Sequence, residues 1–319
     1  MATYNGAQFL VEQLDSILTQ TYQPTRLIVR DDGSTDETVA ILAEYSNRDP
    51  RVIIVDSGSD EEHGAMHNWY SLLQATQSDY ADFDVYALAD QDDIWEAAKL
   101  ERLVEAFARE DARAPFLVYS DYSVIDERGR VLFPSADDSI GLHAGSYATL
   151  LFADSHAWGH SLAFNRSLLE QVVIDEEVVA QSLPHDAYLA KTCLLIGKIR
   201  FLDMPLTRYR RHGKNVSAIV YEFHWRELIN RLSIVRLGKV YERVLNNSLM
   251  SIRKHGELAS FNRELADAVL SVLFRGGIYG VVKLKQMGVR RKQLVRSASL
   301  YCVVFLRLPR KLLRAGEGQ

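Results

Sequence analysis

The chain has 319 residues, of which 47% are hydrophobic and 25% are charged, and its formal net charge is -5. This composition is close to that of an average globular protein, so it excludes a disordered or collagen-like chain and supplies enough apolar side chains for a sizeable core. Two cysteines, Cys193 and Cys302, form no disulfide framework or metal-ligand pattern, and no run approaches the roughly 20 apolar residues of a membrane-spanning helix.

Strands and helices alternate through the first half of the chain. Amphipathic spacing predicts helices over three segments, residues 6–20, 33–45 and 97–110. The second of these opens with Ser34 and has Glu37 three residues later, which is typical of a capping box. Short apolar or β-branched runs, each after a polar or Pro-containing turn, predict four strands at residues 26–32, 52–56, 84–90 and 116–121.

This alternation indicates an α/β fold with a mostly parallel, doubly wound sheet and helices on both faces. In such sheets, ligands bind at the carboxyl ends of the strands. Those ends carry a set of closely spaced carboxylates, namely Asp31, Asp32, Asp90, Asp92 and Asp93.

The stretch DQDD, residues 90–93, places three carboxylates within four positions directly after an apolar run. A hard cation such as Mg²⁺ or Mn²⁺ prefers oxygen ligands and commonly bridges one or two carboxylates to substrate phosphates. The alternative is that these aspartates are turn residues or helix N-caps, a role that suits Asp93 best. We therefore expect Asp90 and Asp92 near a metal–diphosphate site.

The stretch DDGSTDE, residues 31–37, contains a Gly turn and an N-cap. Those two features do not explain two adjacent aspartates at a strand end. One of them has the chemistry to accept a hydrogen bond from the imide N–H of uracil or thymine.

Six motifs in this order resemble the family-2 inverting glycosyltransferases of GT-A fold. They lie over about residues 1–217 and are ATYNG, DDGSTDE and DQDD, followed by GHSLAFNRSLL (159–169), PHDAYLA (184–190) and RYRRHGKNV (208–216). The last three narrow the resemblance to a bacterial rhamnosyltransferase-like branch that builds cell-surface polysaccharides.

The resemblance implies a role for each matching residue. Ala2, Thr3 and Tyr4 would line the nucleoside pocket, with Tyr4 near the base. Asp32 would read the base imide beside Asp31, Asp90 would approach the ribose or the metal, and Asp92 would be the principal ligand of Mn²⁺ or Mg²⁺. Arg211 and His212 would face the diphosphate, with His212 as a further metal ligand.

The same resemblance makes Asp186 the catalytic base. It lies in the first turn of a predicted helix, so its alternative role is compensation of the helix dipole. For the basic run RYRRHGKN, the alternative to a diphosphate clamp is a solvated loop, and either Arg210 or Arg211 suits the clamp.

The resemblance also raises an expectation about the first strand. In the family this strand normally begins several residues before the ATYNG segment, whereas here Met1 falls inside it. We therefore expect a first strand that is truncated at its N-terminal end.

The C-terminal hundred residues differ sharply in charge. Residues 1–216 carry 18 Lys and Arg against 35 Asp and Glu, whereas residues 217–319 carry 19 against 7. This shift predicts a GT-A domain over 1–217 and a helical, basic region over 218–319. Within it, Phe305, Leu306 and Leu308, with Leu312 and Leu313, give an apolar face that suits a membrane surface, although an oligomerisation or packing helix is the alternative. No motif for nucleic acid accompanies the charge.

These observations predict an inverting, metal-dependent transferase that moves L-rhamnose from dTDP-rhamnose to a hydroxyl of a lipid-linked or growing surface polysaccharide. A UDP-hexose donor and a catalytically silent scaffold in an assembly complex are the alternatives. A sugar-nucleotide pyrophosphorylase would need a Gly-rich, basic N-terminal loop that MATYNGAQF does not supply. With no signal peptide, we expect a cytoplasmic protein at the inner face of the membrane.

Overall fold

The computed structural model describes residues 1–23, 25–55, 63–153, 156–213, 215, 234–292 and 294–306. The chain divides into two compact units. Unit 1 comprises Met1–Ala136, Trp158–Asp186 and Lys198–Lys214, and unit 2 comprises Asp137–Ala157, Ala187–Gly197 and Asn215–Gln319. All candidate site residues named above belong to unit 1.

Unit 1 begins with a small parallel sheet. Its strands lie in the order β1 (Ala2–Thr3), β2 (Leu27–Asp31) and β3 (Val52–Val55), and Thr3 pairs with Asp31. Because side chains alternate along a strand, Leu27 and Val29 face one side of this sheet while Arg30 faces the other. The carboxyl ends of β1 and β2 therefore meet at one edge, as expected from the sequence.

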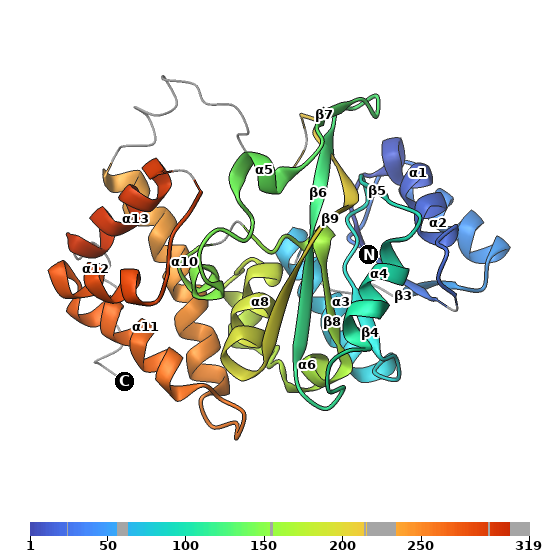
Figure 1. Ribbon diagram of the computed structural model, residues 1–319. Helices are drawn as coiled ribbons and strands as arrows, with labels where there is room; N and C mark the ends of the chain where they lie inside the picture. The colour runs from blue at the N-terminus through green and yellow to red at the C-terminus, as the bar shows by residue number, and fades with distance from the viewer. Residues whose placement is uncertain are drawn as a thin grey trace. The chain divides into compact units, whose positions relative to one another are not determined.

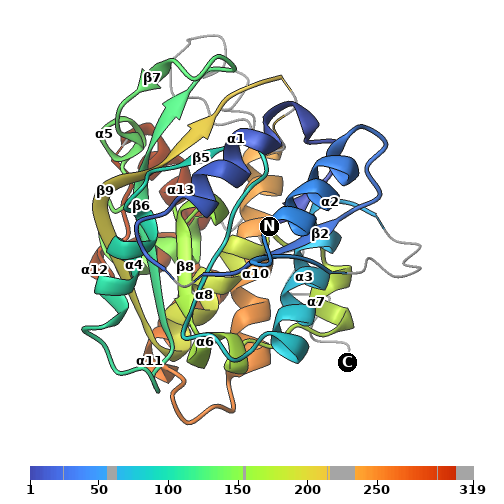
Figure 2. The same ribbon diagram turned by 90° about the vertical axis from the view of Figure 1, so that its right-hand side faces the viewer.

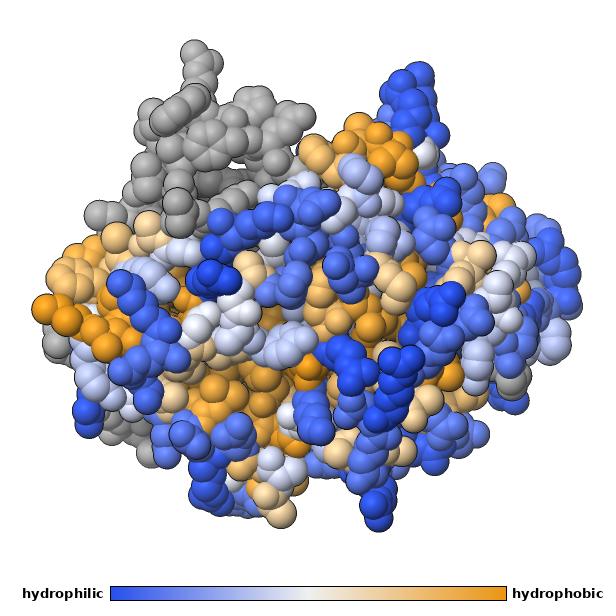
Figure 3. All heavy atoms as spheres, viewed as in Figure 1, coloured by the Kyte–Doolittle hydropathy of each residue, from blue (hydrophilic) through white to orange (hydrophobic). Residues whose placement is uncertain are grey.

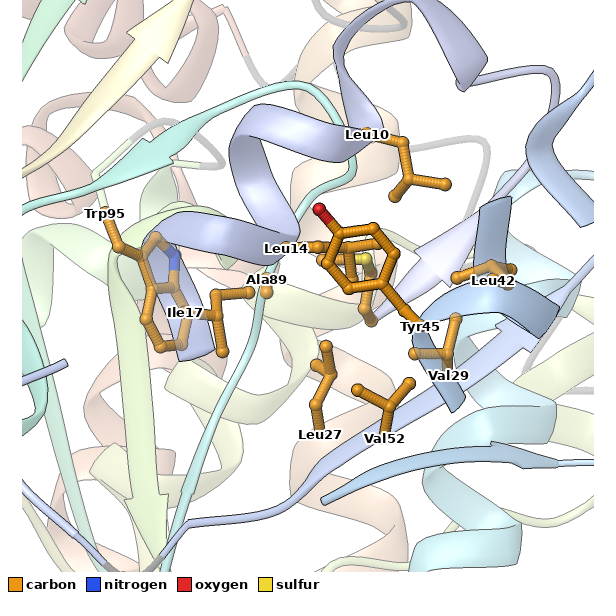
Figure 4. Close-up of a cluster of buried hydrophobic side chains, with 11 residues drawn as sticks. Leu10, Leu14, Ile17, Leu27, Val29, Leu42, Tyr45, Val52, Ala89 and Trp95 are labelled. Atoms are coloured by element: carbon orange, nitrogen blue, oxygen red, sulfur yellow. The ribbon is translucent and has the colours of Figure 1, made fainter. Parts of the chain in front are cut away.

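Helices cover both faces of this sheet (Figure 2). Leu27 and Val29 pack with apolar residues of α1 (Ala7–Leu18) and α2 (Thr38–Arg48) in the core shown in Figure 4. On the opposite face, Arg30 donates a hydrogen bond of 2.9 Å to Asn68 Oδ1 of α3 (Ala65–Asp79). The first turns of α1 and α3 thereby lie beside the loops that end β1 and β2.

The second sheet of unit 1 is mixed rather than parallel. Its strand order is β4 (Val85–Ala87), β8 (Leu162–Asn165), β6 (Phe116–Ile125), β9 (Lys198–Arg210) and β5 (Ile94–Trp95), and β7 (Val131–Phe133) pairs with β6. Only the β6–β9 pair, the two long strands side by side in Figure 1, is parallel. The α/β class is as predicted, but the expected parallel character holds for the first sheet alone.

Short helices complete unit 1. Phe116 and Val118 of β6 pack against Leu103 and Ala106 of α4 (Lys99–Phe107). The other helical segments of this unit are the 3₁₀ turn η2 (Gly159–Ser161), α6 (Arg166–Gln171) and α7 (Glu176–Ala180).

The predicted capping box at Ser34 and Glu37 is wrong. Helix α2 begins at Thr38, and Glu37 makes no side-chain cap. The backbone N–H of Thr38 instead donates to Asp36 Oδ1 at 3.0 Å, and Ser34 is bound to Asp31. Asp31 therefore competes successfully for the hydroxyl that would cap the helix.

The described part of unit 2 consists of helices and the turns that join them. It contains most of α5 (Ala136–Ile140), the 3₁₀ helix η1 (Tyr147–Phe152) and α8 (His185–Ile196) from residue 187 on, with α10 (Ile234–His255), α11 (Arg263–Arg275), α12 (Gly277–Gln286) and α13 (Leu294–Phe305). Buried polar bonds join α8 to α10, including one of 2.8 Å from Lys191 Nζ to the Val244 carbonyl.

The helical character predicted for the C-terminal region is confirmed over these helices. The segment with Leu308, Leu312 and Leu313 lies outside the described residues, and so do residues 216–233. Within the described part of the chain, no helix has both the length and the apolar character to cross a bilayer.

Candidate active site

Side-chain hydrogen bonds tie the DQDD loop to the end of β1. Gln91 accepts a hydrogen bond of 2.8 Å from the Tyr4 N–H and donates one of 3.0 Å to the Tyr4 carbonyl. Gly6 makes room for this amide, because a Cβ at residue 6 would lie 2.3 Å from Gln91 Oε1. In addition, buried Gln13 of α1 donates to the Asp90 carbonyl at 2.7 Å. The ATYNG and DQDD motifs thus form one structure.

The DDGSTDE loop is tied to the same place through Asp31. Its carboxylate accepts hydrogen bonds from Thr3 Oγ1 at 2.8 Å, from Ser34 Oγ at 2.6 Å and from the Ser34 N–H at 2.7 Å. Ser34 Oγ also accepts from the N–H of Asn5, a residue with a φ of 47°. These contacts give Asp31 the task of shaping the loop. Ala2 lies beside it in β1, paired with Arg30.

Asp32 points away from this network, because adjacent strand residues alternate in direction. Its side chain is only 6% exposed, and Oδ2 accepts a hydrogen bond of 2.8 Å from the Gly64 N–H. Its other oxygen lies 3.7 Å from Arg30 Nη1 and 3.4 Å from the exposed ring nitrogen Nδ1 of His63. The Tyr4 ring is 54% exposed. A buried carboxylate and an exposed aromatic ring therefore flank the end of β1.

A buried arginine holds the carboxylates of the DQDD loop in position. Arg210, at the end of β9, is 1% exposed, and its Nε donates to the Asp92 carbonyl at 2.9 Å. Its Nη1 donates to the Glu127 carbonyl, and Nη2 pairs with Glu12 Oε2 at 2.5 Å. The Arg210 N–H donates to Asp93 Oδ1 at 2.9 Å. Asp93 is thus bound to β9 and does not cap α4, contrary to the N-cap alternative.

The carboxylates repel one another. Burial, followed by the negative charges of Asp92 and Asp186, raises the pKa of Asp90 to about 7. Burial and the charges of Asp92 and Asp90 raise the pKa of Asp93 well above its usual range. Lys99 is a buried countercharge, and burial lowers its pKa to about 7 against the opposing pull of Asp93 and Asp90. Burial and mutual repulsion therefore disfavour the charged carboxylates, and a bound cation would favour them.

Asp92, just before β5, and His212, just beyond β9, face each other. His212 Nε2 lies 2.7 Å from Asp92 Oδ2, and the two side chains are 10% and 17% exposed. The His212 ring packs on Phe9 of α1 at a centroid distance of 5.1 Å. Across the described residues, no three or more His, Cys, Asp or Glu side chains are grouped to hold a metal by themselves. Any cation here therefore needs further ligands from a bound molecule.

Asp186 lies in the first turn of α8 and is 8% exposed. Its Oδ2 accepts a hydrogen bond of 3.0 Å from the Gly159 N–H, and its charge contributes to the raised pKa of Asp90. The neighbouring His185 ring stacks on Trp69 of α3 at 4.4 Å, and burial lowers the pKa of His185 to about 3. Asp186 is therefore the ionisable residue that this turn brings toward the DQDD carboxylates.

The structure brings most of the predicted residues together and separates the roles of the two arginines. Arg211 has an exposed side chain and a backbone N–H that donates to the Ile125 carbonyl. Arg210 is buried, which leaves Arg211 as the solvent-facing member of the pair.

Sequence reasoning missed Gln91, Gly64 and the positioning role of Arg210. Gln91 lies inside the quoted DQDD motif, so its polar side chain among three carboxylates was a usable signal. Gly64 and Arg210 gave no such signal, because their roles arise from contacts with Asp32 and with the DQDD loop, both distant in sequence.

Comparison with known proteins identifies the class to which this site belongs. The family model described as "Glycosyl transferase family 2" matches residues 1–173, more than half of the chain. The chain therefore belongs to glycosyl transferase family 2. This match confirms the family expected from the sequence motifs.

Individual relatives are distant. An uncharacterized glycosyltransferase of Nostoc is 26% identical over 220 residues, which cover 67% of this chain and 64% of the Nostoc protein. The chain thus spans just under two thirds of that relative's length. A dTDP-rhamnosyl transferase of Shigella flexneri is 26% identical over 242 residues, covering 74% of this chain and 79% of that protein.

The crystal structure of S. aureus TarS supports the fold. It matches with a TM-score of 0.52 at 14% identity, over 97% of this chain and 54% of TarS. This likeness extends to the α/β GT-A fold with a helical C-terminal region.

We predict that Gly6→Ala destabilises the protein by about 1–2 kcal/mol through loss of the Gln91–Tyr4 hydrogen bonds. Urea denaturation of Gly6→Ala, Gln91→Ala and the double variant measures the coupling. With Gln91→Ala in place, the Gly6→Ala substitution should cost less than about 0.5 kcal/mol. Equal costs in both backgrounds would show that the two residues do not interact.

We predict a pH effect from His185. Its pKa is about 3 in the fold, against about 6.5 in the unfolded chain. As the pH falls, the unfolded state therefore binds the proton first. The contribution of neutral His185 to the free energy of unfolding is present above pH 6.5 and is lost as the pH falls toward 3. Between pH 7.5 and pH 5, His185→Phe should lose about 2 kcal/mol less stability than wild type in urea denaturation.

The control for this pH effect is Trp69→Phe, which weakens the same ring stack without removing a titrating group. It should lower stability at both pH values and retain the wild-type pH dependence. A His185→Phe variant with the wild-type dependence would contradict the assignment.

Proposed function

We propose that this chain is an inverting, metal-dependent glycosyltransferase that moves L-rhamnose from dTDP-rhamnose to a hydroxyl of a lipid-linked or growing surface polysaccharide. The observation that carries the proposal is the convergence of Asp90, Asp92 and Asp186 beside the Asp92–His212 pair. Family membership supplies the reaction class, and the site residues suit each part of such a donor.

The first part is the nucleoside. Asp32 has the buried, hydrogen-bonded carboxylate that suits an imide N–H, and Tyr4 offers an exposed ring on which a base can stack. Asp31 is saturated by Thr3 and Ser34, so its contribution is the shape of the loop. Thr3 and Ala2 position this edge through β1.

The second part is the diphosphate and its cation. His212 Nε2 and Asp92 Oδ2 lie 2.7 Å apart, so a ring nitrogen and a carboxylate oxygen stand side by side as candidate ligands. This donor set fits a cation that takes its remaining ligands from phosphate oxygens and water. The imidazole favours Mn²⁺ over Mg²⁺, which prefers oxygen ligands alone. Bound there, the cation would stabilise the negative charge of the leaving diphosphate.

Other residues complete this part of the site. Arg210 fixes the Asp92 backbone, and Phe9 supports the His212 ring, so both ligands are held by packing. Arg211 is the exposed side chain assigned to the diphosphate. Asp90 is near enough to Asp92 and Asp186 for their charges to raise its pKa, and the ribose or the metal is its proposed partner.

The third part is the reacting sugar. Asp186 takes the proton from the attacking hydroxyl on the face opposite the leaving diphosphate, and a single displacement inverts the anomeric carbon. The Gly159 N–H fixes one oxygen of this carboxylate, and the positive end of α8 stabilises its charged form. Proton removal by such a base is worth typically 10²–10⁴-fold in rate.

The choice of rhamnose rests on the motifs of the second half of the domain and on the Shigella relative. A UDP-hexose donor of the same fold is the alternative, because thymine and uracil differ by one methyl group. A silent scaffold is a further alternative, against which the intact set Asp32, Asp92 and Asp186 argues.

We predict that dTDP-rhamnose raises the melting temperature of the protein in a Mn²⁺-dependent manner, because a ligand that binds only the folded state stabilises it. The shift should exceed those with UDP-glucose, UDP, GDP and dTDP. Asp92→Asn should lose the metal-dependent part of the shift. Asp84→Asn is the matched control, because Asp84 has a side chain that is 99% exposed.

The thermal shifts distinguish the rhamnose donor, the UDP-hexose donor and the silent scaffold. A larger shift with UDP-glucose would replace the rhamnose donor, and no shift with any nucleotide would favour the scaffold. A wild-type metal response in Asp92→Asn would remove Asp92 from the metal site.

We predict that Asp186→Asn binds dTDP-rhamnose with wild-type affinity but loses 10²–10⁴-fold in turnover. The Asn carbonyl retains the hydrogen bond from Gly159, so the fold should be preserved. Without an identified acceptor, the rate measured is that of dTDP-rhamnose hydrolysis, in which water is the acceptor. Turnover within about tenfold of wild type would mean that another residue is the base.

A further inference from the structure

An apolar corner of unit 2 is exposed where α11 meets α12. Its members are Phe274 at 55% exposed, Ile278 at 73%, Tyr279 at 44% and Val282 at 47%. Figure 3 shows apolar side chains, in orange, over α12. Gly276 and Gly277, with φ values of 51° and 60°, turn the chain between the two helices and bring these side chains together. We refer to these four residues as the α11–α12 corner.

The exposed face of α12 is opposite its packed face. Leu284 is fully buried, and a Cβ at Gly280 would lie 2.6 Å from Val304 Cγ1 of α13, so this side of the helix packs closely on α13. At 100° per residue, Ile278 and Val282 lie on the other side. Ile278 and Val282 are therefore not part of the core of unit 2.

Basic side chains border the corner. Arg275 lies over the Tyr279 ring at 5.1 Å, Lys285 is exposed at one edge of the apolar face, and Lys283 is half-buried at the other. The sequence from Ala268 to Gly316 contains no Asp or Glu. An apolar stripe with lysines along both edges is the pattern of a helix that lies in a lipid headgroup layer.

This charge pattern decides between possible occupants. A second copy of the chain that docked through the same corner would bring the Arg275, Lys283 and Lys285 side chains of both copies together, and like charges oppose that contact. An anionic lipid surface instead attracts the lysines and accepts the apolar side chains below its headgroups. Lys and Arg side chains also reach outward to headgroups while their stems cover apolar surface.

We propose that the α11–α12 corner docks unit 2 on an anionic membrane, with Ile278 and Val282 entering the headgroup–acyl boundary. Arg275, Lys283 and Lys285 contact the anionic headgroups. The exposed Phe305 and Leu306 at the end of α13 extend the same apolar character. This surface lies within the described residues, whereas the segment around Leu308–Leu313, predicted from the sequence to meet lipid, lies outside them.

Vesicle flotation of the full chain tests this proposal. The wild-type protein should float with vesicles of equal parts phosphatidylcholine and phosphatidylglycerol, and binding should weaken as salt is added. It should bind vesicles of phosphatidylcholine alone at least about tenfold less. The variant Ile278→Ser/Val282→Ser should lose about tenfold or more in binding to the anionic vesicles.

The matched control is Val131→Ser/Leu132→Ser in β7 of unit 1. These residues are also exposed, at 59% and 46%, and the substitutions remove the same kind of apolar surface. The control should float like wild type, and circular dichroism should give both variants wild-type melting curves. A third variant, Lys283→Gln/Lys285→Gln, should lose the preference for anionic vesicles.

Three outcomes would overturn the proposal: wild-type protein that does not float with anionic vesicles, equal flotation of the Ile278→Ser/Val282→Ser variant, or an oligomer in sedimentation that this variant dissolves. The last outcome would assign the corner to a second copy of the chain. Nucleotide-dependent thermal shifts of the same variants report on the transferase site separately, so failure of one proposal is distinguishable from failure of the other.

Discussion

The candidate site depends on one buried cation, the guanidinium of Arg210. It binds the Asp92 carbonyl, the Glu127 carbonyl and the Glu12 carboxylate from three separate segments, and its ring contact is Phe9 at 4.7 Å. An arginine suits this position because its planar fork donates in several fixed directions at once. With this bond in place, the end of β9 carries His212 to Asp92. The DQDD loop is also held by Gln13, Tyr4 and the Arg210 backbone N–H, but among these contacts the guanidinium alone reaches the Asp92 carbonyl.

The second constraint is the mutual repulsion of the carboxylates. Asp90, Asp92 and Asp93 lie close together, and Lys99 is a buried countercharge to Asp90 and Asp93. Lys99 donates to the His160 carbonyl at 2.6 Å and to Thr207 Oγ1 at 2.8 Å. A chain selected for stability alone would not retain such a cluster. Burial, and then the charges of Asp92 and Asp186, raise the pKa of Asp90, and a bound cation would favour its charged form.

Much of the fold was predictable because its elements carry local periodic patterns. The strand predicted at 26–32 is β2 (Leu27–Asp31), and the helix predicted at 97–110 contains α4 (Lys99–Phe107). Strand pairing was not predictable, because β4 and β6 have the apolar composition of parallel strands yet pair with β8 in antiparallel fashion. The domain boundary near residue 217 remains a prediction.

The site was predictable in its residue types and not in their contacts. Motifs identified Asp32, Asp92 and Asp186, since their chemistry is local to a few positions. Arg210 lies in a basic run whose composition is typical of a solvated loop, so its burial was not predictable from the sequence. In the structure, β9 extends through residue 210 and the Arg210 side chain is buried. Likewise, Ser34 fits a capping box in sequence, but Asp31 binds its hydroxyl in space.

The uneven charge of the two halves of the chain fits the two proposals, a donor–metal site in the first half and a lipid-docking surface in the second. Residues 1–216 carry 35 acidic against 18 basic residues, so this half is repelled both by a diphosphate and by an anionic lipid surface. The proposed cation at Asp92 and His212 would offset the first repulsion, that of the diphosphate, locally. The second has to be answered elsewhere, and residues 217–319, with 19 basic against 7 acidic residues, have the charge to do so. An acceptor that resides in a membrane would therefore require both halves, the acidic half for the donor and its metal and the basic half for the lipid.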